Sequence, residues 1–377
     1  MIRIERRLRQ PRCLTVAVPV GSVVVALLIS AVILAATGHD PVYTYHRLFT
    51  SAFVDSGALS NTLVSATPLL FTGLAAAAAF RMQLFNIGAE GQLYLGAAGA
   101  MGVALLIGPA PTPVHVIVMV AAGAAAGAAW AAIPGLLRAF LRTNEIITSL
   151  MLNYVAALVI DYLIFDSLSY WRDTSTPDAR VFPQGKFLPD SANWPTTTIG
   201  PGAGLVIPLG FLLAVAAAVV LWFLYQRTRF GFEVAVTADS PRAARYSGMR
   251  TRRKIVAVML ISGALAGIGG ASQDGDFRHQ LDPKGLEQSY YGYTGIVVAA
   301  LARYNPLAVV LVAFLLGGLQ TAGYALQGVD FPSGLVGVME GVILFCVLAG
   351  ELLVRYRVRL RRRGAEPAPP ARAEVAS

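Results

Sequence analysis

The segment FNIGAEGQLYLGA, residues 85–97, opens a glycine-rich apolar run that reaches past residue 107 without another charged residue. Its first half carries Asn86, Glu90 and Gln92, three side chains with strong hydrogen-bonding groups. A carboxylate within a membrane span is costly and faces protein or water rather than lipid. If the run enters a membrane, these three side chains belong to the protein interior.

The composition of the whole chain supports a membrane location. The 377 residues are 56% hydrophobic and only 14% charged, with a mean hydropathy of +0.61, whereas soluble domains carry about 25% charged residues. Apolar runs of about 20 residues, the length needed to cross a bilayer, recur throughout and are continuous rather than alternating. The fold class predicted is an all-α polytopic integral membrane protein. We predict ten transmembrane helices, at residues 14–36, 60–80, 87–107, 114–137, 146–165, 204–225, 255–271, 288–302, 306–325 and 334–353.

The charge distribution predicts cytoplasmic N- and C-termini. Ten spans then leave 24 of the 30 Lys and Arg residues on the cytoplasmic side, in agreement with the positive-inside rule. The eighth span has only 15 residues, so it is short, tilted or partly re-entrant. Glycine-rich entries in spans two to five and seven to ten suggest an inverted repeat. The predicted regions are a basic N-terminus at 1–13, a transmembrane domain at 14–354 with an extracytoplasmic loop at 166–202 and a cytoplasmic loop at 226–254, and a basic, then disordered, tail at 355–377.

Several function classes lack the residues they need. The four histidines lie far apart and form no metal-binding pair, and no GxxxxGK[ST] phosphate loop is present. The two cysteines have no metal spacing. The net charge of +9 is explained by basic clusters beside membrane helices, which contact lipid headgroups. The sequence therefore predicts no metal site, no nucleic-acid partner and no ATP hydrolysis by this chain.

The loop QRTRFGFEVAVTADSPRAARYSGMRTRRK, residues 226–254, contains a predicted short helix. Asp239 or Ser240 can cap it, Pro241 is favoured at its first position, and Gly248 ends it. Its small side chains suit docking into a cleft of another protein. The alternative is a surface loop that only obeys the charge rule.

Four segments resemble one known family. The quoted 85–97 segment, NEIITSLMLNYVA (144–156), TRFGFEVAVTADSPRAARYSGM (228–249) and GYTGIVVAALARYNPLAVVLVAFLLGGL (292–319) are similar to permease subunits of bacterial ABC importers for nucleosides and simple sugars. That family includes ribose-type permeases and is related to branched-chain amino acid permeases. The NIGAEGQ version is most similar to the purine nucleoside group.

The resemblance implies a set of partners. A separate ABC ATPase would bind ATP and Mg, while this chain would bind no cofactor. A second permease chain, identical or homologous, would complete the pathway in a bacterial cytoplasmic membrane. An extracytoplasmic substrate-binding protein would dock on the outer loop that contains Trp171 and Trp194. The coupling helix that contacts the ATPase would comprise Ser240, Pro241, Arg242, Ala243, Ala244, Arg245, Tyr246 and Gly248.

Polar residues in the spans are candidates for the substrate pathway, because amides and carboxylates bind hydroxyls and base edges while tyrosines stack on rings. On a continuous helix, Asn86 and Glu90 would share a face near the cytoplasmic end, with the tyrosines at the outer end. Alternatively, Asn86 and Glu90 satisfy backbone groups where the helix is broken at Gly88 and Gly91, and the tyrosines form an interfacial belt. The predicted pathway residues are Asn86, Glu90, Gln92, Asn153, Tyr290, Tyr293 and Glu340.

The function predicted from these features is a nucleoside permease subunit of an ABC importer. The first alternative is a ribose-like simple-sugar permease. An ion-coupled secondary transporter would need no ATPase, and Glu90, Asp161 and Glu340 would then relay protons. A membrane-embedded enzyme is least favoured, because no nucleophile is paired with a base.

Overall fold

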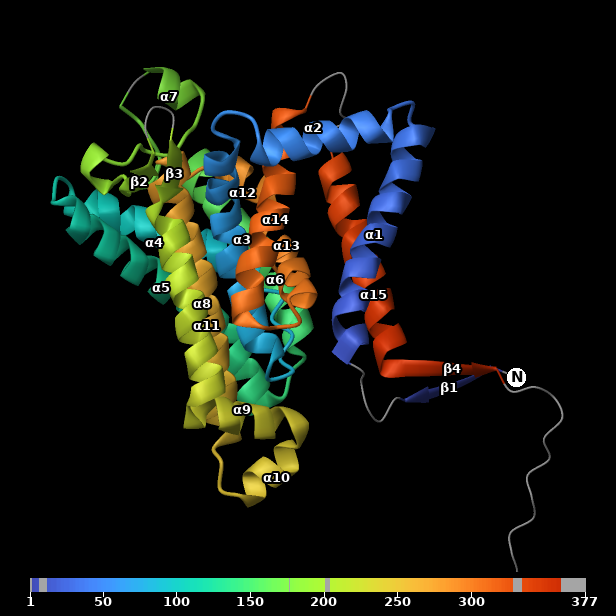
Figure 1. The fold of residues 1–377 in the computed structure, drawn as a ribbon. Coiled ribbons are helices and arrows are strands. Elements are labelled where there is room, and N and C mark those ends of the chain that lie inside the picture. The colour runs from blue at the N-terminus through green and yellow to red at the C-terminus, as the bar shows by residue number, and fades with distance from the viewer. Residues whose placement is uncertain (1, 7–11, 176, 201–203, 328–333, 361–377) are drawn as a thin grey trace, which may run out of the picture.

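The computed structural model describes residues 2–6, 12–175, 177–200, 204–327 and 334–360. Helices dominate this part of the chain (Figure 1). Strand β1 (Ile2–Arg6) pairs with β4 (Tyr356–Leu360), and β2 (Thr196–Ile199) pairs with β3 (Leu205–Pro208), both antiparallel. The longer helices are α1 (Arg12–Ala36), α2 (Pro41–Phe53), α3 (Ala58–Phe80), α4 (Ala89–Ile107), α5 (Thr112–Leu136), α6 (Glu145–Asp161), α8 (Leu209–Arg227), α9 (Arg229–Asp239), α11 (Thr251–Ser272), α13 (Tyr291–Leu301), α14 (Pro306–Ala325) and α15 (Leu335–Arg355).

Short helices and π-helical turns complete the chain. The π-helical turns η1 (Leu137–Leu141), η2 (Tyr162–Asp166) and η4 (Gln273–Arg278) extend α5, α6 and α11. The short helices are α7 (Pro177–Val181), the 3₁₀ turn η3 (Asp190–Ala192), α10 (Pro241–Tyr246) and α12 (Pro283–Ser289).

Among the described residues, seven helices are long and apolar enough to cross a membrane: α3, α4, α5 with η1, α6 with η2, α8, α11 with η4, and α14. Each of the ten predicted spans contains a helix. Helix α13 has only 11 residues, and α1 is bent by 118° against α2. The described residues thus hold seven candidate spans, or eight if the bent pair forms one span, and the count of ten stays a prediction.

Helix α2 was not predicted from the sequence. Asp40 caps it by accepting a hydrogen bond from the Val42 backbone N–H at 2.8 Å, and Pro41 occupies its first position. Leu48 and Ala52 are buried on its inner face, whereas Phe49 is exposed. Figure 1 shows α2 lying across one end of the bundle. This short amphipathic helix turns the chain from α1 into α3.

Helix α3 lies at the centre of the bundle. Its alanines at 75–79 all have no exposed surface, and α11, α13, α14 and α8 all pack against it. Methyl side chains let the surrounding backbones approach closely, as in other membrane bundles. The Ala-rich sequence therefore produces a tightly surrounded central helix.

Glycines bring α4, α5 and α11 into direct backbone contact. A Cβ atom at Gly267 would collide with the Gly123 carbonyl oxygen, and one at Gly96 would collide with the Gly267 backbone. No side chain larger than hydrogen fits at Gly96 or Gly267 without a shift of the backbone. The small-residue runs of the sequence are accordingly packing surfaces, as small residues in membrane helices commonly are.

The outer loop folds back onto the bundle. Trp171 Nε1 donates a hydrogen bond to the Ala98 carbonyl oxygen of α4 at 2.8 Å. Trp194 is 4% exposed and packs on Gly275 of η4. Both tryptophans thus anchor the loop to the bundle. Docking of a substrate-binding protein on this loop stays a prediction.

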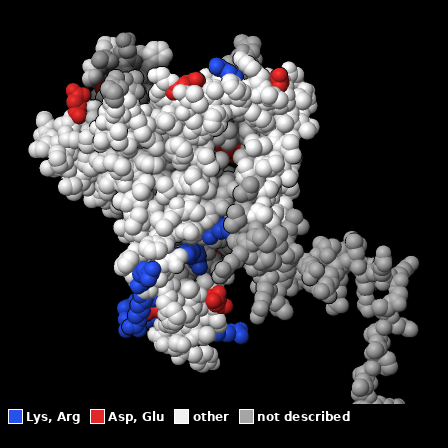
Figure 2. All heavy atoms as spheres, in the orientation of Figure 1, with Lys and Arg blue, Asp and Glu red and all other residues white. Residues whose placement is uncertain are grey.

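Charge separates the two ends of the molecule. Figure 2 shows most of the visible Lys and Arg side chains gathered around the end that carries α9 and α10, while the opposite end is mostly uncharged, with a few acidic groups and a small basic patch. This segregation agrees with a bundle oriented by the positive-inside rule. The α9–α10 end is the one that the rule would place in the cytoplasm.

Candidate functional site

The chain between α3 and α4 is irregular, and Asn86 organises it. Its Nδ2 donates to Gln92 Oε1 at 3.0 Å and to Ser262 Oγ at 2.9 Å, while its Oδ1 accepts from the Gly88 backbone N–H at 3.0 Å and from Gln92 Nε2 at 3.1 Å. Because α4 begins only at Ala89, Asn86 does not share a helical face with Glu90 as expected. Asn86 and Gln92 bind each other instead, and both are buried.

Helix α6 supplies the remaining hydrogen bonds of this irregular segment. Asn153 Oδ1 accepts from the Gly91 N–H at 2.9 Å, and its Nδ2 donates to the Ile87 carbonyl oxygen at 2.9 Å and to the Tyr293 hydroxyl at 3.2 Å. Ser149 Oγ accepts from the Ile87 N–H at 3.2 Å. Buried backbone groups need such partners where no water is available. Three of these four hydrogen bonds therefore go to backbone groups of Ile87 and Gly91.

Glu90 joins the start of α4 to the start of α13. Its Oε2 accepts from the Gly292 N–H at 2.5 Å and from the Tyr293 N–H at 3.2 Å, and its Oε1 accepts from the Tyr94 hydroxyl at 2.8 Å. These N–H groups belong to the first turn of α13, whose own N-cap, Tyr290, makes no side-chain cap. The carboxylate satisfies free donors at the positive end of the helix dipole. Glu90 is 2% exposed and acts as a cap supplied by another helix.

The contact between Glu90 and the start of α13 contradicts the predicted positions of Glu90 and the tyrosines along their spans. Glu90 and the tyrosines were expected at opposite ends of their spans, yet Glu90 binds Gly292 and Tyr293. Eleven residues of α13 extend about 16 Å, about half of a hydrocarbon core of about 30 Å. Helix α13 therefore starts part-way through the bundle, preceded by the short α12. The eighth predicted span contains a short helix, in agreement with the first of the alternatives that the sequence left open.

A second polar cluster surrounds Glu340 of α15. Its Oε2 accepts from the Thr294 hydroxyl at 2.8 Å and its Oε1 accepts from Gln320 Nε2 at 3.3 Å. Glu340 also lines a groove of about 160 Å³. The other described residues of this groove are Gln288, Ser289, Tyr290, Gln320, Gly323, Tyr324, Gln327, Gly334 and Gly337.

The groove has the chemistry of a site for a polar ring compound. Tyr290 is 60% exposed and Tyr324 is 52% exposed, so their rings are free to stack on a ligand. The structure brings Tyr290 and Glu340 to one groove, and Tyr293 lies beside Tyr290 with ring centroids 6.4 Å apart. Asn86, Gln92 and Asn153 belong to the separate network around the start of α4.

Helix α10 has the predicted form of a docking helix. Ser240 is its N-cap and accepts from the Ala243 N–H at 3.3 Å, Pro241 is its first residue, and Gly248 has a positive φ of 76° just beyond its end. Ser240 rather than Asp239 is thus the cap. Ala244 is buried against the bundle. The outward side carries exposed Arg242, Ala243, Arg245 and Tyr246, and Tyr246 is 94% exposed.

An ion pair fixes the helix that precedes α10. Glu233 of α9 accepts from Lys254 Nζ at 2.6 Å and pairs with Arg229 at 3.0 Å. The hydrogen bond from the Lys254 ammonium group holds the pKa of Glu233 below its usual value. This link ties α9 to the first turn of α11.

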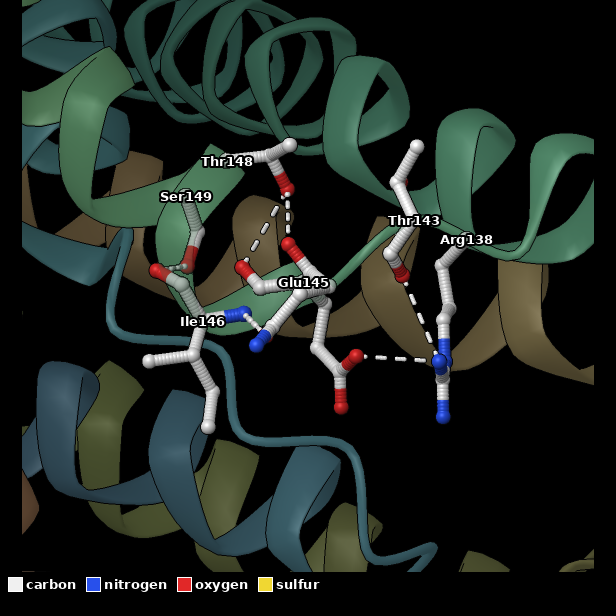
Figure 3. A network of polar contacts seen from close by, with 7 residues as sticks. Arg138, Thr143, Glu145, Ile146, Thr148 and Ser149 are labelled. Atoms are coloured by element: carbon white, nitrogen blue, oxygen red, sulfur yellow. Dashed lines mark hydrogen bonds and ion pairs between the residues drawn. The ribbon is translucent and has the colours of Figure 1, made fainter.

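A second ion pair closes the turn between η1 and α6. Arg138 Nε lies 3.1 Å from Glu145 Oε2, and Arg138 Nη1 donates to the Thr143 carbonyl oxygen at 3.3 Å. Figure 3 shows Glu145 extending from the start of α6 toward Arg138. The buried Glu145 is therefore compensated locally and is not free to bind a ligand.

Comparison with known proteins decides the family. A family model described as branched-chain amino acid transport system / permease component matches residues 58–348. The chain belongs to this permease family.

Its relatives are permease subunits of ABC transporters. The permease is 35% identical to the glucose ABC transporter permease protein TsgB13 of Haloferax volcanii, over 96% of this chain and 95% of the relative. It is 32% identical to the guanosine ABC transporter permease protein NupP of Bacillus subtilis, over 92% and 97%. It is 29% identical to the nucleoside ABC transporter permease protein NupB of Lactococcus lactis, over 88% and 90%. The resemblance predicted from the four segments is confirmed.

Sequence reasoning missed several polar residues that the permease uses. Ser262 of α11 receives the Asn86 amide and donates to the Ala75 carbonyl oxygen at 2.8 Å. Thr72 donates to the Tyr291 carbonyl oxygen at 2.8 Å, and Thr294 and Gln320 hold Glu340. The available signal was a hydroxyl or amide within an apolar run. Such residues commonly hydrogen-bond across membrane helices.

Proposed function

We propose that this multi-pass membrane permease moves nucleosides into the cell as the translocation subunit of an ABC importer. The groove that joins Tyr290, Tyr324, Gln320 and Glu340 carries the proposal. Exposed aromatic rings can stack on a nucleobase. The Glu340 carboxylate can accept hydrogen bonds from ribose hydroxyls, and the Gln320 amide can donate to them or accept from them. Relatives named for guanosine and for nucleosides align with most of the chain.

The proposal includes the partners that such a subunit needs. An ABC ATPase docks on the exposed side of α10, where the largely exposed Tyr246 offers an aromatic anchor of the kind that dominates interfaces. That ATPase binds ATP and Mg. A second permease chain completes the pathway, and a substrate-binding protein delivers the nucleoside at the end opposite α10. The location is a bacterial cytoplasmic membrane.

The substrate groove is tested by transport. Vesicles or cells with the complete transporter should take up labelled guanosine, and Tyr290→Ala should reduce that uptake at least tenfold by removing the stacking surface. The matched control is Tyr162→Ala, another exposed tyrosine that does not line the groove. Equal losses in both variants, with equal protein in the membrane, would contradict the role of the groove.

The docking of the ATPase is tested separately. Tyr246→Ala should abolish co-purification of the ATPase and uptake, whereas Tyr43→Ala, an exposed tyrosine of α2, should affect neither. Full ATPase binding by Tyr246→Ala would place the docking surface elsewhere.

A simple sugar is the second candidate substrate. The relative from Haloferax volcanii is named for glucose, and a sugar ring also stacks on tyrosine. A competition experiment decides between the two candidate substrates. If the sugar proposal holds, uptake of labelled glucose or ribose should be blocked by an excess of the same unlabelled sugar and not by an excess of guanosine.

The proton-coupled alternative finds no connected relay among the described contacts. Asp161 accepts from Lys284 Nζ at 3.0 Å, Glu90 binds the start of α13, and Glu340 binds Thr294 and Gln320. Each carboxylate thus has its own partners. Uptake that persists without the ATPase and follows a proton gradient would revive this alternative.

A further inference from the structure

A groove of about 900 Å³ lies at the α10 end of the permease. Four segments enclose it: the turn after α3, the end of α5 with η1, the α9–α10 segment, and the start of α11. The residues that line it are Met82, Gln83, Leu84, Arg138, Ala139, Phe140, Arg142, Thr237, Ala238, Pro241, Arg245, Met249, Arg250, Thr251, Arg252, Arg253 and Ile255.

The charge of this groove is one-sided. Six of its lining residues are arginines and none is acidic. Arg138 is compensated by Glu145, but the other five make no ion pair in the described part of the chain. Lys254 follows these arginines in the sequence, but it does not line the groove and its charge is neutralised by Glu233. Five uncompensated guanidinium groups around one groove repel each other, so an anion bound there would stabilise the arrangement.

The same groove has an apolar side. Phe140 is 56% exposed, and Met82, Leu84 and Ile255 also line the groove. The Arg252 guanidinium lies over the Phe140 ring, 5.6 Å from its centroid. The ligand that fits both sides is an amphiphile with an anionic head and an apolar tail.

The groove lies where two spans end. The span Thr112–Leu141 ends at Leu141, which is 69% exposed, and the span Thr251–Arg278 begins at Thr251. Groups at span ends lie at the level of lipid headgroups, and the apolar side chains next to them lie at the level of acyl chains. The groove thus lies where its arginines can reach lipid headgroups and its apolar side chains can contact acyl chains.

We propose that this groove binds an anionic phospholipid of the leaflet on the α10 side, with its phosphate among Arg142, Arg250, Arg252 and Arg253 and its acyl chains along Phe140 and Ile255. Guanidinium groups bind phosphate through paired N–H donors. The first turn of α11 has no side-chain cap, and the backbone N–H groups of Arg252 and Arg253 in that turn add donors for the same phosphate. Basic pockets between membrane helices on this side are typical headgroup sites.

A bound lipid would also affect α10. Pro241 and Arg245 belong both to α10 and to the wall of the groove. A lipid headgroup that neutralises the arginines would hold α10 against the ends of α5 and α11. The lipid would set the position of the helix and leave Arg242, Ala243 and Tyr246 outside the groove, and the proposal does not depend on the identity of the transported substrate.

Native mass spectrometry of the purified full chain tests the proposal. Wild-type protein should retain phosphatidylglycerol in preference to phosphatidylcholine with the same acyl chains. Arg142→Gln/Arg252→Gln should weaken phosphatidylglycerol binding about 30-fold, at roughly 1 kcal/mol for each arginine. The matched control is Arg227→Gln/Arg242→Gln, which removes two charges from the same end but outside the groove lining.

Three results would overturn the proposal: equal retention of the two lipids by the wild type, equal weakening in the control, or displacement of the lipid by millimolar inorganic phosphate, which would indicate a soluble anion. Arg142→Lys/Arg252→Lys covers the case in which the glutamine variant fails to fold. It keeps the charge and loses the paired donors, so phosphatidylglycerol binding should fall by less than in the glutamine variant while staying above that of phosphatidylcholine.

Discussion

Replacing Glu90 distinguishes its two predicted roles, support of the backbone and lining of the pathway. Glu90→Ala removes the acceptor for the Gly292 and Tyr293 N–H groups and for the Tyr94 hydroxyl. A buried donor without a partner costs about 1–3 kcal/mol. With three donors affected, of which Tyr293 is partly exposed, we expect a loss of about 3–6 kcal/mol in the free energy of unfolding.

Glu90→Gln should cost less. The amide oxygen still accepts from both backbone N–H groups, and the amide nitrogen can donate to the Tyr94 hydroxyl, whose own proton then lacks an acceptor. Bonds to a charged acceptor are about twice as strong as neutral ones, so a loss of about 1–2 kcal/mol is expected. As a control, Asp161→Ala breaks a partly exposed pair with Lys284 and should cost less than about 1 kcal/mol.

The free energy of unfolding is measured in mixed micelles by titration with a denaturing detergent, alongside substrate uptake. The expected order of destabilisation is Glu90→Ala, then Glu90→Gln, then Asp161→Ala. If Glu90→Ala has the same free energy of unfolding as the wild type but has lost uptake, the capping role is refuted and Glu90 belongs to the pathway.

Three further substitutions test other parts of the structure. Asn153→Ala removes the bonds to the Ile87 carbonyl oxygen before α4 and to the Gly91 N–H in its first turn, and should lower the free energy of unfolding by about 2–4 kcal/mol; unchanged detergent stability would contradict this. Gly267→Val places atoms against the Gly123 carbonyl oxygen and should prevent accumulation of folded protein, as judged by gel filtration, whereas Gly337→Val, at an open position, should not. The lowered pKa of Glu233 means that its stabilising effect is present above the unfolded pKa, about 4.3, and is lost as pH falls through the lower folded pKa. Glu233→Gln should therefore flatten the acid limb of a pH–stability profile; an unchanged limb would show that other groups cause it.

Local features of this fold were predictable from the sequence because they depend on neighbouring residues. Apolar runs located α3, α5, α8 and α14, and Ser240 with Pro241 located the start of α10. The Asp40–Pro41 pair carried the same kind of signal for α2, but a 13-residue amphipathic helix is too short and too polar to register as a span.

Contacts between distant segments were not predictable. Glu90 and Gly292 are 202 residues apart, and no periodicity within either helix indicates that one caps the other. The packing of Trp171 and Trp194 could not be predicted for the same reason, since their partners, Ala98 and Gly275, lie on α4 and η4. The candidate pathway residues could be selected by polarity alone, but their division into two clusters required the packing of α13 against α3 and α15.

The capping of α13 by Glu90 also has a consequence for biosynthesis. A ribosome adds about 5–20 residues per second, so Gly292, which follows Glu90 by 202 residues, is made about 10–40 s after it. During that interval the carboxylate already lies in a helix bound for the membrane without its final partners. Tyr94, four residues later on the same helix, emerges within about a second and donates to Glu90 in the finished structure. The tyrosine can thus shield the carboxylate until the second half of the chain arrives.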